Sequence, residues 1–281
     1  MPPRPDSDEA AFKAFEAEGW HARAGGYDRL TGAVTARVGE PLLDAVGAGP
    51  GTRLLDVATG TGRLAAAAAD RGARVTGIDL AEGMLAAARA RRPGLDLHRA
   101  DAEALPFPAA SFTAATAGFV FNHLPRPERA ATELARVLAP GGLVAAAVWE
   151  VPRRNRLTGI IADAIEEAGA AGGAGVPAGP DPYRFADDGA FAALFAGAGF
   201  GDVLVRTLTF AVPVGSAEEY WADVLDGSVR AAAELGAASA SARRRARAVV
   251  ERELAAHRAG KGHELPAVVK LASGRRPGAE E

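Results

Sequence analysis

The stretch RLLDVATGTGRLAAAAADRGARVTGIDL, residues 53–80, decides the fold. A short apolar strand holds Asp56, the chain turns at two glycines, a helix follows, and a second strand ends in Asp79. Gly60 and Gly62 allow a tight turn and a close backbone approach to a ligand, because glycine has no Cβ. The following helix directs its free N–H groups and positive dipole end to the same place. The stretch therefore predicts a strand–turn–helix ligand site.

The alternation of strand and helix continues as far as Glu150. Short apolar runs alternate with helix-favouring, alanine-rich runs, and Gly or Pro stands at their ends. This order predicts right-handed crossovers and an α/β fold with a doubly wound, mostly parallel sheet covered on both faces. We expect strands at 53–58, 74–80, 95–100, 111–121 and 143–150, and helices at 62–72, 82–92 and 126–142.

The regular alternation ends beyond Glu150. We expect a helix at 155–169, a mobile Gly/Ala/Pro loop at 168–182, a helix at 187–199 capped by Asp187, a strand at 200–212, a helical segment at 216–260 and a last strand at 267–273. We expect a single domain over residues 11–273, in which 50–150 form the cofactor-binding core and 11–45, 152–186 and 216–260 form helical caps. The ends, 1–10 and 274–281, are predicted to be disordered tails.

Composition narrows the class of protein. The 281 residues include 32 Lys and Arg against 35 Asp and Glu, so no large net field favours nucleic acid or an anionic membrane. Cys is absent and the five His are scattered, so we expect no metal site. No apolar run is long enough to cross a bilayer or act as a signal peptide. We expect a cytoplasmic protein with a small-molecule partner, and leave a homodimer open.

The glycine turn alone serves NAD as well as other adenosine-containing cofactors. Residues 60–65, Gly-Thr-Gly-Arg-Leu-Ala, fit the dinucleotide fingerprint with Ala in its last place. Asp79 closes the second strand, beside the first, where a carboxylate can accept hydrogen bonds from two ribose hydroxyls. The rest of the chain has to decide between these ligands.

Four details point away from NAD. Asp56 stands inside the first strand, where burial of a carboxylate is costly without hydrogen bonds. Leu80 and Met84 form an apolar platform for a purine, and Asp101 ends the third strand, where it can accept from an adenine amino group. Finally, ELARVLAPGGLVAAAVWE, residues 133–150, gives a helix, a Pro-Gly-Gly turn and a strand.

Together these stretches resemble the class I S-adenosylmethionine-dependent methyltransferases, in particular the small-molecule branch of ubiquinone and menaquinone C-methyltransferases. LDVATGTG, GIDLAEGML, DAEALPFP and LAPGGL carry the resemblance, which covers about residues 20–150. It implies a Rossmann-like, seven-stranded sheet. The family's usual acidic-x-Gly-x-Gly-x-Gly has Ala58 in its first glycine place, which we expect to be tolerated through a negative φ.

The resemblance also implies roles for individual residues toward S-adenosylmethionine. Carbonyls near Ala58 and Gly60 would accept from the methionyl ammonium, and Asp79 would hold the ribose diol. Tyr27 would reach the methionyl carboxylate, and Phe119 would line the far side. The full implied set is Tyr27, Asp56, Ala58, Thr59, Gly60, Gly62, Asp79, Leu80, Met84, Asp101, Ala102 and Phe119.

Each of these side chains also has a purely structural interpretation. Asp56 could brace the loop, Asp79 could cap the next helix, and Leu80 and Met84 could belong to the core. His123, after the fourth strand, could take a proton from a phenol, enol or amine as the methyl arrives, or could simply hold its turn.

The predicted function is methyl transfer from S-adenosylmethionine to O, N or C of a small organic acceptor, in secondary metabolism, with S-adenosylhomocysteine as product. Two alternatives stay open. One is an NAD(P)-dependent oxidoreductase, although no Tyr-x-x-x-Lys motif is present. The other is a protein of the same fold that binds the cofactor without transferring its methyl group.

Overall fold

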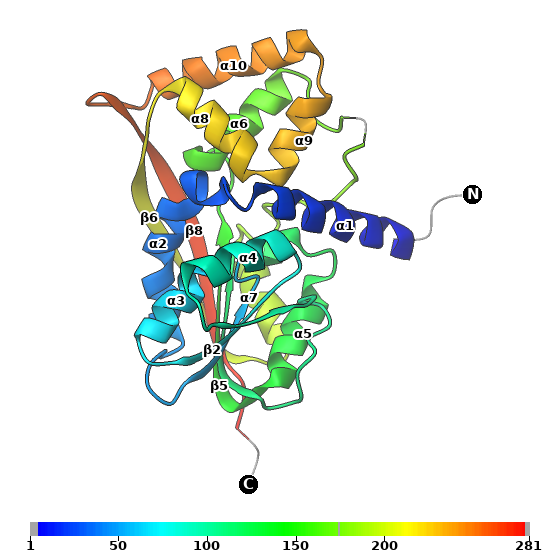
Figure 1. Cartoon of the computed structure of the whole chain (residues 1–281), viewed down its shortest axis with the longest axis vertical. Coiled ribbons are helices and arrows are strands. Elements are labelled where there is room, and N and C mark those ends of the chain that lie inside the picture. Colours follow the sequence, from blue (N-terminus) through cyan, green and yellow to red (C-terminus); the bar gives the residue numbers. More distant parts are fainter. Residues whose placement is uncertain (1–4, 174, 279–281) are drawn as a thin grey trace. The chain divides into compact units, whose positions relative to one another are not determined.

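The computed structural model describes residues 5–173 and 175–278, and the chain divides into two compact units (Figure 1). Unit 1 contains residues up to Val34, then 150–179 and 209–268. Unit 2 contains residues 35–149, 180–208 and those from Val269 onward. The single domain predicted over residues 11–273 stays a prediction. Because the chain divides into two units, each unit is described by itself.

The sheet follows the order β3-β2-β1-β4-β5-β8-β6. Strands β1 to β5 are parallel, and β8 runs antiparallel to β5. The seven strands of this path agree with the expected sheet, and the two-residue strand β7 pairs with β8 in addition. The described strands are β1 Arg53–Val57, β2 Arg74–Asp79, β3 Asp96–Arg99, β4 Phe112–Gly118, β5 Leu138–Trp149, β6 Gly201–Val214, β7 Arg258–Ala259 and β8 Gly262–Arg275.

The helices of unit 2 follow the predicted alternation. They are α3 Arg63–Asp70, α4 Glu82–Arg91, α5 Pro127–Val137 and α7 Asp188–Gly197, with a short 3-10 turn, η1, at Phe121–His123. Because the strand order reverses between β1 and β4, right-handed crossovers place α3 and α4 on the opposite face from α5. Asp187 caps α7 as predicted, since its side chain accepts from the Ala190 N–H at 2.8 Å.

The core of unit 2 lies between the sheet and α5 and α7. It contains the central strand residues Leu55, Val57 and Ala115, and the aromatic cluster Phe121, Phe191 and Phe195. Phe121 meets Phe195 edge-on, with ring centroids 5.3 Å apart. Phe191 is fully buried in this core.

Unit 1 contributes helices that pack mainly on one another. The helices are α1 Pro5–Arg23, α2 Tyr27–Ala45 (of which residues 27–34 belong to unit 1), α6 Arg156–Glu167, α8 Ala217–Gly227, α9 Val229–Ala237 and α10 Ala240–Ala255. A capping box starts α8: Ser216 accepts from the Glu219 N–H, and the Glu219 side chain accepts from the Ser216 N–H. Tyr220 is fully buried, and its hydroxyl donates to the Leu157 carbonyl at 2.8 Å.

Some boundaries differ from those predicted. Helix α1 already begins at Pro5, so residues 5–10 of the expected tail are helical, and residues 1–4 lie outside the described part. Helix α5 ends at Val137, before the predicted stop, because β5 begins at Leu138 and its pairing with β4 shifts across the Pro-Gly-Gly turn. Strand β8 continues to Arg275, which pairs with Leu143, into the predicted 274–281 tail; residues 279–281 are outside the description.

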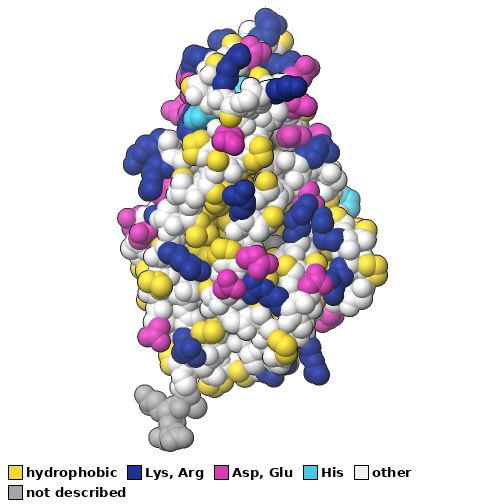
Figure 2. Space-filling model, turned by 90° about the vertical axis from the view of Figure 1, so that its left-hand side faces the viewer, with side chains coloured by type: hydrophobic (Ala, Val, Ile, Leu, Met, Phe, Trp, Pro, Cys, Tyr) yellow, Lys and Arg dark blue, Asp and Glu magenta, His cyan; other side chains and the backbone are white. Residues whose placement is uncertain are grey.

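The surface carries charges of both signs. Figure 2 shows Lys and Arg interspersed with Asp and Glu over the face in view. In the described ranges, no helix is both long and apolar enough to span a membrane. Within the same ranges, no three His, Asp or Glu side chains gather as a metal site.

Candidate functional site

The register of the parallel strands brings most predicted site residues to one edge of unit 2. Val57 pairs with Ile78 on β2 and with Ala117 on β4, so these three strands end side by side. Asp79 in turn pairs with Arg99, the last residue of β3. The loops after β1 to β4 therefore emerge together at the reversal of strand order, which is where open α/β sheets bind ligands.

Asp56 braces the turn after β1 from beneath. It is only 1% exposed, and its two carboxylate oxygens accept from the Thr59 hydroxyl at 2.7 Å and the Thr116 hydroxyl at 2.8 Å. Burial raises the pKa of Asp56 to about 6, against the lowering effect of these two hydrogen bonds. Thr116 pairs with Asp56 in the strand register, a polar match that the sequence analysis missed.

Ala58 has a φ of +53°, so the expected negative φ was wrong. The turn places this residue in the left-handed region, where a Cβ crowds the following carbonyl at a cost of about 1 kcal/mol. The next residue, Thr59, donates its backbone N–H to the Ile78 carbonyl at 2.8 Å, which ties the turn to β2. Strain of this kind persists where the surrounding contacts impose it.

Gly60 and Gly62 serve different purposes, although both have positive φ values. A Cβ on Gly62 would lie 2.8 Å from the Ala88 Cβ, so this glycine allows α3 and α4 to approach. A Cβ on Gly60 would meet nothing closer than the Ala58 carbonyl oxygen, at 4.0 Å. The packing of the turn therefore does not require a glycine at position 60, and the space above it is open.

Asp79 organises this turn with its carboxylate. One oxygen accepts from the Gly60 N–H at 2.9 Å and the other from the Ala81 N–H at 2.9 Å. The Leu80 N–H also interacts with this carboxylate, which has about four acceptor positions and so keeps acceptor capacity for a vicinal diol. Burial raises the pKa of Asp79 to about 6. Ala81 occupies the N-cap position of α4, and so Asp79 also ties down the start of that helix.

The residues predicted to hold a purine differ in their surroundings. Leu80 is partly exposed beside Asp79, whereas Met84 is buried on α4 and packs as a core residue. Asp101 and Ala102 are both partly buried, and one Asp101 oxygen accepts from the Glu103 N–H at 2.9 Å. That bond shapes the loop after β3.

Phe119 is the first residue after β4 and also has a left-handed backbone, with φ +59°. Its N–H donates to the Ala147 carbonyl at 2.8 Å, and its ring stacks on Trp149 at 4.3 Å between centroids. Ala58 and Phe119, two strained residues, thus stand at the ends of the adjacent strands β1 and β4. Such residues cluster at ligand sites.

His123 lies partly buried in η1, where its N–H donates to the Val120 carbonyl at 2.8 Å. The sequence analysis missed Arg184, which holds this turn. Its guanidinium donates to the Phe121 carbonyl at 2.8 Å and also to the Leu124 carbonyl. No local motif marks Arg184, because the carbonyls that it contacts lie 63 and 60 positions away in sequence.

Tyr27 belongs to unit 1, where it is the first residue of α2. Its ring meets Trp20 edge-on, with centroids 5.7 Å apart. The predicted contact of Tyr27 with a methionyl carboxylate stays a prediction, because the other site residues belong to unit 2.

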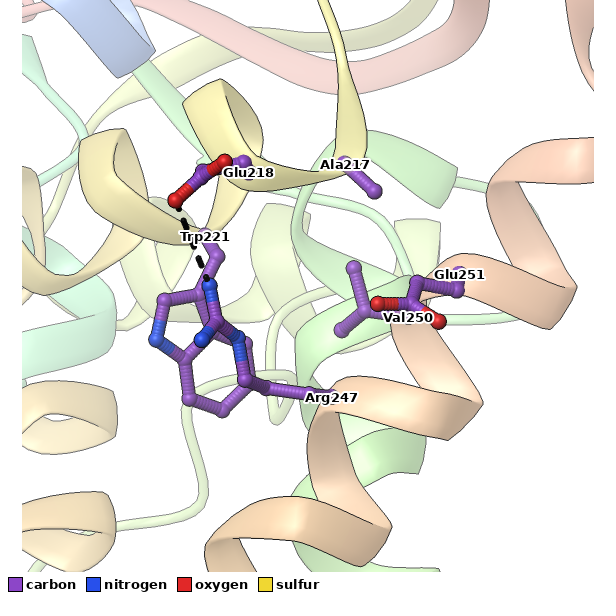
Figure 3. A pocket seen from close by; sticks show the side chains of 6 residues that line it. All are labelled: Ala217, Glu218, Trp221, Arg247, Val250 and Glu251. Atoms are coloured by element: carbon purple, nitrogen blue, oxygen red, sulfur yellow. Dashed lines mark ion pairs between the residues drawn. The ribbon is translucent and has the colours of Figure 1, made fainter.

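Unit 1 has a surface cavity of about 300 Å³ between α8 and α10. Figure 3 shows the Arg247 guanidinium over the Trp221 ring, with its carbon 5.5 Å from the ring centroid, and paired with Glu218 at 4.0 Å. The cavity is lined by Ala217, Glu218, Trp221, Arg247, Val250 and Glu251.

Comparison with known proteins agrees with the geometry of unit 2. Residues 55–146 match the family model described as a methyltransferase domain. A demethylmenaquinone methyltransferase of Renibacterium salmoninarum is 35% identical over 125 residues, which are 44% of this chain and 53% of that protein. The chain spans about half the length of the curated relatives it matches.

Solved structures share the fold. The cyclase SpnF has a TM-score of 0.53 and 25% identity, over 86% of this chain and 82% of that chain. Phosphoethanolamine N-methyltransferase 2 of Haemonchus contortus, in complex with S-adenosyl-L-methionine, has a TM-score of 0.55 and 17% identity, over 90% and 56%. The matched family model, the strand order and the glycine turn agree, and unit 2 has the Rossmann-like fold of the class I S-adenosylmethionine-dependent methyltransferases.

Proposed function

We propose that unit 2 binds S-adenosylmethionine at the carboxyl ends of β1 to β4 and that the protein transfers the methyl group to a small organic acceptor. The observation that carries this proposal is the pairing of Asp79 with Gly60. The carboxylate fixes the turn through the Gly60 N–H at 2.9 Å and keeps acceptor capacity beyond its bonds to backbone N–H groups. Gly60 itself leaves the space above the turn open.

The residues of this edge fit the cofactor. Asp79 would bind the ribose diol, Leu80 would cover one face of the adenine, and Asp101 with the Ala102 N–H would bind its edge. Asp56 would not contact the ligand, because it is only 1% exposed and its oxygens accept from threonine hydroxyls inside unit 2. It would hold the turn in the conformation that presents its carbonyls to the methionyl ammonium.

When bound, S-adenosylmethionine supplies a methyl group on a sulfonium, which is already a strong electrophile. The protein then has to orient the acceptor in line with the methyl–sulfur bond and to exclude water. His123, partly buried just after β4, would take the acceptor's proton. Asp79 and Asp56 lie beneath the cofactor and have no part in this proton transfer.

A small-molecule acceptor is supported by the relatives. The curated Renibacterium protein is named for demethylmenaquinone, a quinone, and the match covers about half of that protein. We therefore propose quinols and phenols as the first acceptors to examine, within secondary metabolism. The stacked rings of Phe119 and Trp149 beside η1 suit a flat acceptor.

A second function is favoured by one structural neighbour. The cyclase SpnF, 25% identical and alike over most of both chains, is named for a cyclisation. A protein of this fold that binds the cofactor and leaves its methyl group in place is therefore the second candidate. The two functions differ in one product, because only methyl transfer releases S-adenosylhomocysteine.

The test has two steps. Thermal unfolding with S-adenosylhomocysteine or NAD should show stabilisation by S-adenosylhomocysteine alone, and stabilisation by NAD alone would reject the proposal. Incubation with S-adenosylmethionine and a panel of quinols and phenols, followed by mass spectrometry, should then show S-adenosylhomocysteine and a product heavier by one methylene. Binding with no transfer to any acceptor would favour the second candidate.

A further inference from the structure

Two of the three buried side-chain atoms that lack a hydrogen-bond partner, over the residues the structure describes, lie at the same turn. They are the Oδ1 of Asn122 and the Nε of Arg184, whereas the third, on Arg23, belongs to unit 1. One is an acceptor and the other a donor. Because such atoms are rare in folded proteins, two complementary ones at one turn need an explanation.

Asn122 is the middle residue of η1 and is 2% exposed. Its side-chain oxygen, Oδ1, has no hydrogen-bond partner among the described residues. A buried amide oxygen without a donor destabilises the folded state, and an apolar side chain in the same place would avoid this cost. Position 122 therefore carries an amide oxygen that forms no hydrogen bond with the surrounding residues.

Arg184 reaches the same turn from the segment after the glycine-rich loop. Its guanidinium donates to the carbonyls of Phe121 and Leu124, which flank Asn122 in sequence, and it lies over the Phe185 ring at 5.0 Å. Burial lowers the pKa of the Arg184 guanidinium, whereas the charges of Glu128, Asp181 and Glu103 act in the opposite direction. Its Nε–H is buried and unused.

The turn lies at the edge that holds the glycine turn. Strand β4 pairs with β1 up to Val57 and Ala117, and η1 begins only three residues after Gly118, the last residue of β4. A group bound at η1 thus sits beside the proposed cofactor site rather than at a remote surface.

We propose that Asn122 and Arg184 bind a hydroxyl group of the methyl acceptor. The hydroxyl would donate to Asn122 Oδ1 and accept from the Arg184 Nε–H, which satisfies both atoms with one group. An ammonium has no lone pair to accept from the Arg184 Nε–H, and a carboxylate has no proton for Asn122 Oδ1. This inference rests on the proposed function and names the acceptor class as hydroxylated molecules.

The first experiment asks whether the Asn122 amide is needed by the fold. Asn122→Leu should leave the melting temperature unchanged or raise it, because no hydrogen bond is lost. Asn155 is the matched control, since it is fully buried but donates to the Thr158 hydroxyl at 2.8 Å and accepts from the Val268 N–H at 3.4 Å. Asn155→Leu should lower the melting temperature by about 5 °C. Asn122→Ala repeats the measurement without added bulk.

The second experiment uses phenol as the probe and anisole, its methyl ether, as the donorless control. Ligand-observed NMR on protein saturated with S-adenosylhomocysteine should show phenol binding at least tenfold tighter than anisole binding. Asn122→Leu and Arg184→Lys should each reduce this preference to less than twofold. The affinity for S-adenosylhomocysteine should stay within twofold in both variants.

Three results would overturn the inference. Asn122→Leu could unfold at a lower temperature as Asn155→Leu does, which would make the amide structural. Phenol and anisole could bind alike, or neither bind, which would remove the hydroxyl site. A tenfold loss of S-adenosylhomocysteine affinity in Asn122→Leu would assign the amide to the cofactor. Failure of the unmodified protein to bind S-adenosylhomocysteine would instead reject the proposed function itself.

Discussion

The two units use their polar side chains in different ways. At the strand ends of unit 2, Asp79 accepts from two backbone N–H groups and Asp56 from two hydroxyls; Asp56 is buried and Asp79 is partly buried. In unit 1, charged side chains pair with one another at the surface, as Arg29 does with Asp223 at 3.1 Å. Buried carboxylates with free acceptor positions are costly, whereas surface pairs cost little and contribute little.

The unit 1 cavity differs from the strand ends of unit 2 in the same way. The one cation that lines it, Arg247, already lies over Trp221 and is paired with Glu218 (Figure 3). The edge of unit 2 instead has acceptors and open space above a glycine. A cavity alone therefore does not identify a ligand-binding site. Polar groups with unused hydrogen-bonding capacity identify one better.

The largest effect should come from Asp79→Ala. Removing the carboxylate takes away both ribose acceptors and the bond that holds the Gly60 N–H. The affinity for S-adenosylhomocysteine should fall at least 100-fold, or about 3 kcal/mol, in titration calorimetry. Glu218→Ala, at the unit 1 cavity, is the control and should change nothing; equal affinities in the two variants would break the comparison.

The next effect separates the two glycines of the turn. Gly62→Ala should lower the free energy of unfolding by about 2 kcal/mol or more, because its Cβ meets Ala88 at 2.8 Å at a positive φ. Gly60→Ala has no such clash and should cost only about 1 kcal/mol, but should weaken S-adenosylhomocysteine binding about tenfold. Denaturant unfolding and calorimetry measure the two quantities, and the reverse order would contradict our assignment.

The pH dependence of binding and of stability should have opposite signs. Only ionised Asp79 accepts from both ribose hydroxyls, so affinity for S-adenosylhomocysteine should fall about tenfold per pH unit below its pKa of about 6. Asp79→Asn should remove this dependence. The raised pKa means that the folded state binds the proton more tightly than the unfolded state, so the free energy of unfolding should rise as the pH falls from above 6 toward 4.

Asp56 adds to the same stability change. Its pKa of about 6, against 3.8 when unperturbed, corresponds to about 3 kcal/mol over that range for this buried carboxyl. Asp56→Asn should therefore flatten the stability profile in denaturant unfolding at pH 4 to 8. A profile in which stability falls between pH 6 and pH 4 would show that neither pKa is raised.

A smaller effect is expected at the strained alanine. Ala58→Gly should raise the free energy of unfolding by about 1 kcal/mol, because glycine adopts the observed φ of +53° without strain. Ala110, with φ +59° in the loop before β4, is the matched control, and Ala110→Gly should give a similar gain. Destabilisation by Ala58→Gly alone would show that its Cβ makes contacts that outweigh the strain.

The smallest effect should follow from Arg247→Ala in unit 1. An exposed pair at 4.0 Å and one cation–π contact together account for about 1 kcal/mol at most. Binding of S-adenosylhomocysteine should not change. A tenfold loss of binding in calorimetry would assign a ligand role to the unit 1 cavity.

Much of unit 2 was predictable because its signals are local. The alternation of strand and helix, the cap at Asp187 and the strand-ending Asp79 depend on residues close together in sequence, and the structure confirms each of these elements. The bracing role of Asp56, left open beside ligand contact, is supported by its two hydroxyl donors. The register of parallel strands then follows from the topology.

The rest depends on distant contacts. The φ of Ala58 is imposed by the turn's bond to β2, which residue type does not reveal. Arg184 contacts the carbonyls of Phe121 and Leu124, which lie 63 and 60 positions away in sequence, so no local pattern reveals the contact. The acceptor site therefore lies beyond what sequence patterns predict, whereas the proposed cofactor site does not.

A crystal structure of the protein with S-adenosylhomocysteine tests the central claim most directly. We expect both ribose hydroxyls to lie within hydrogen-bond distance of the Asp79 carboxylate and the homocysteine portion to lie above Gly60. Ligand bound elsewhere, or a ribose with no contact to Asp79, would contradict it.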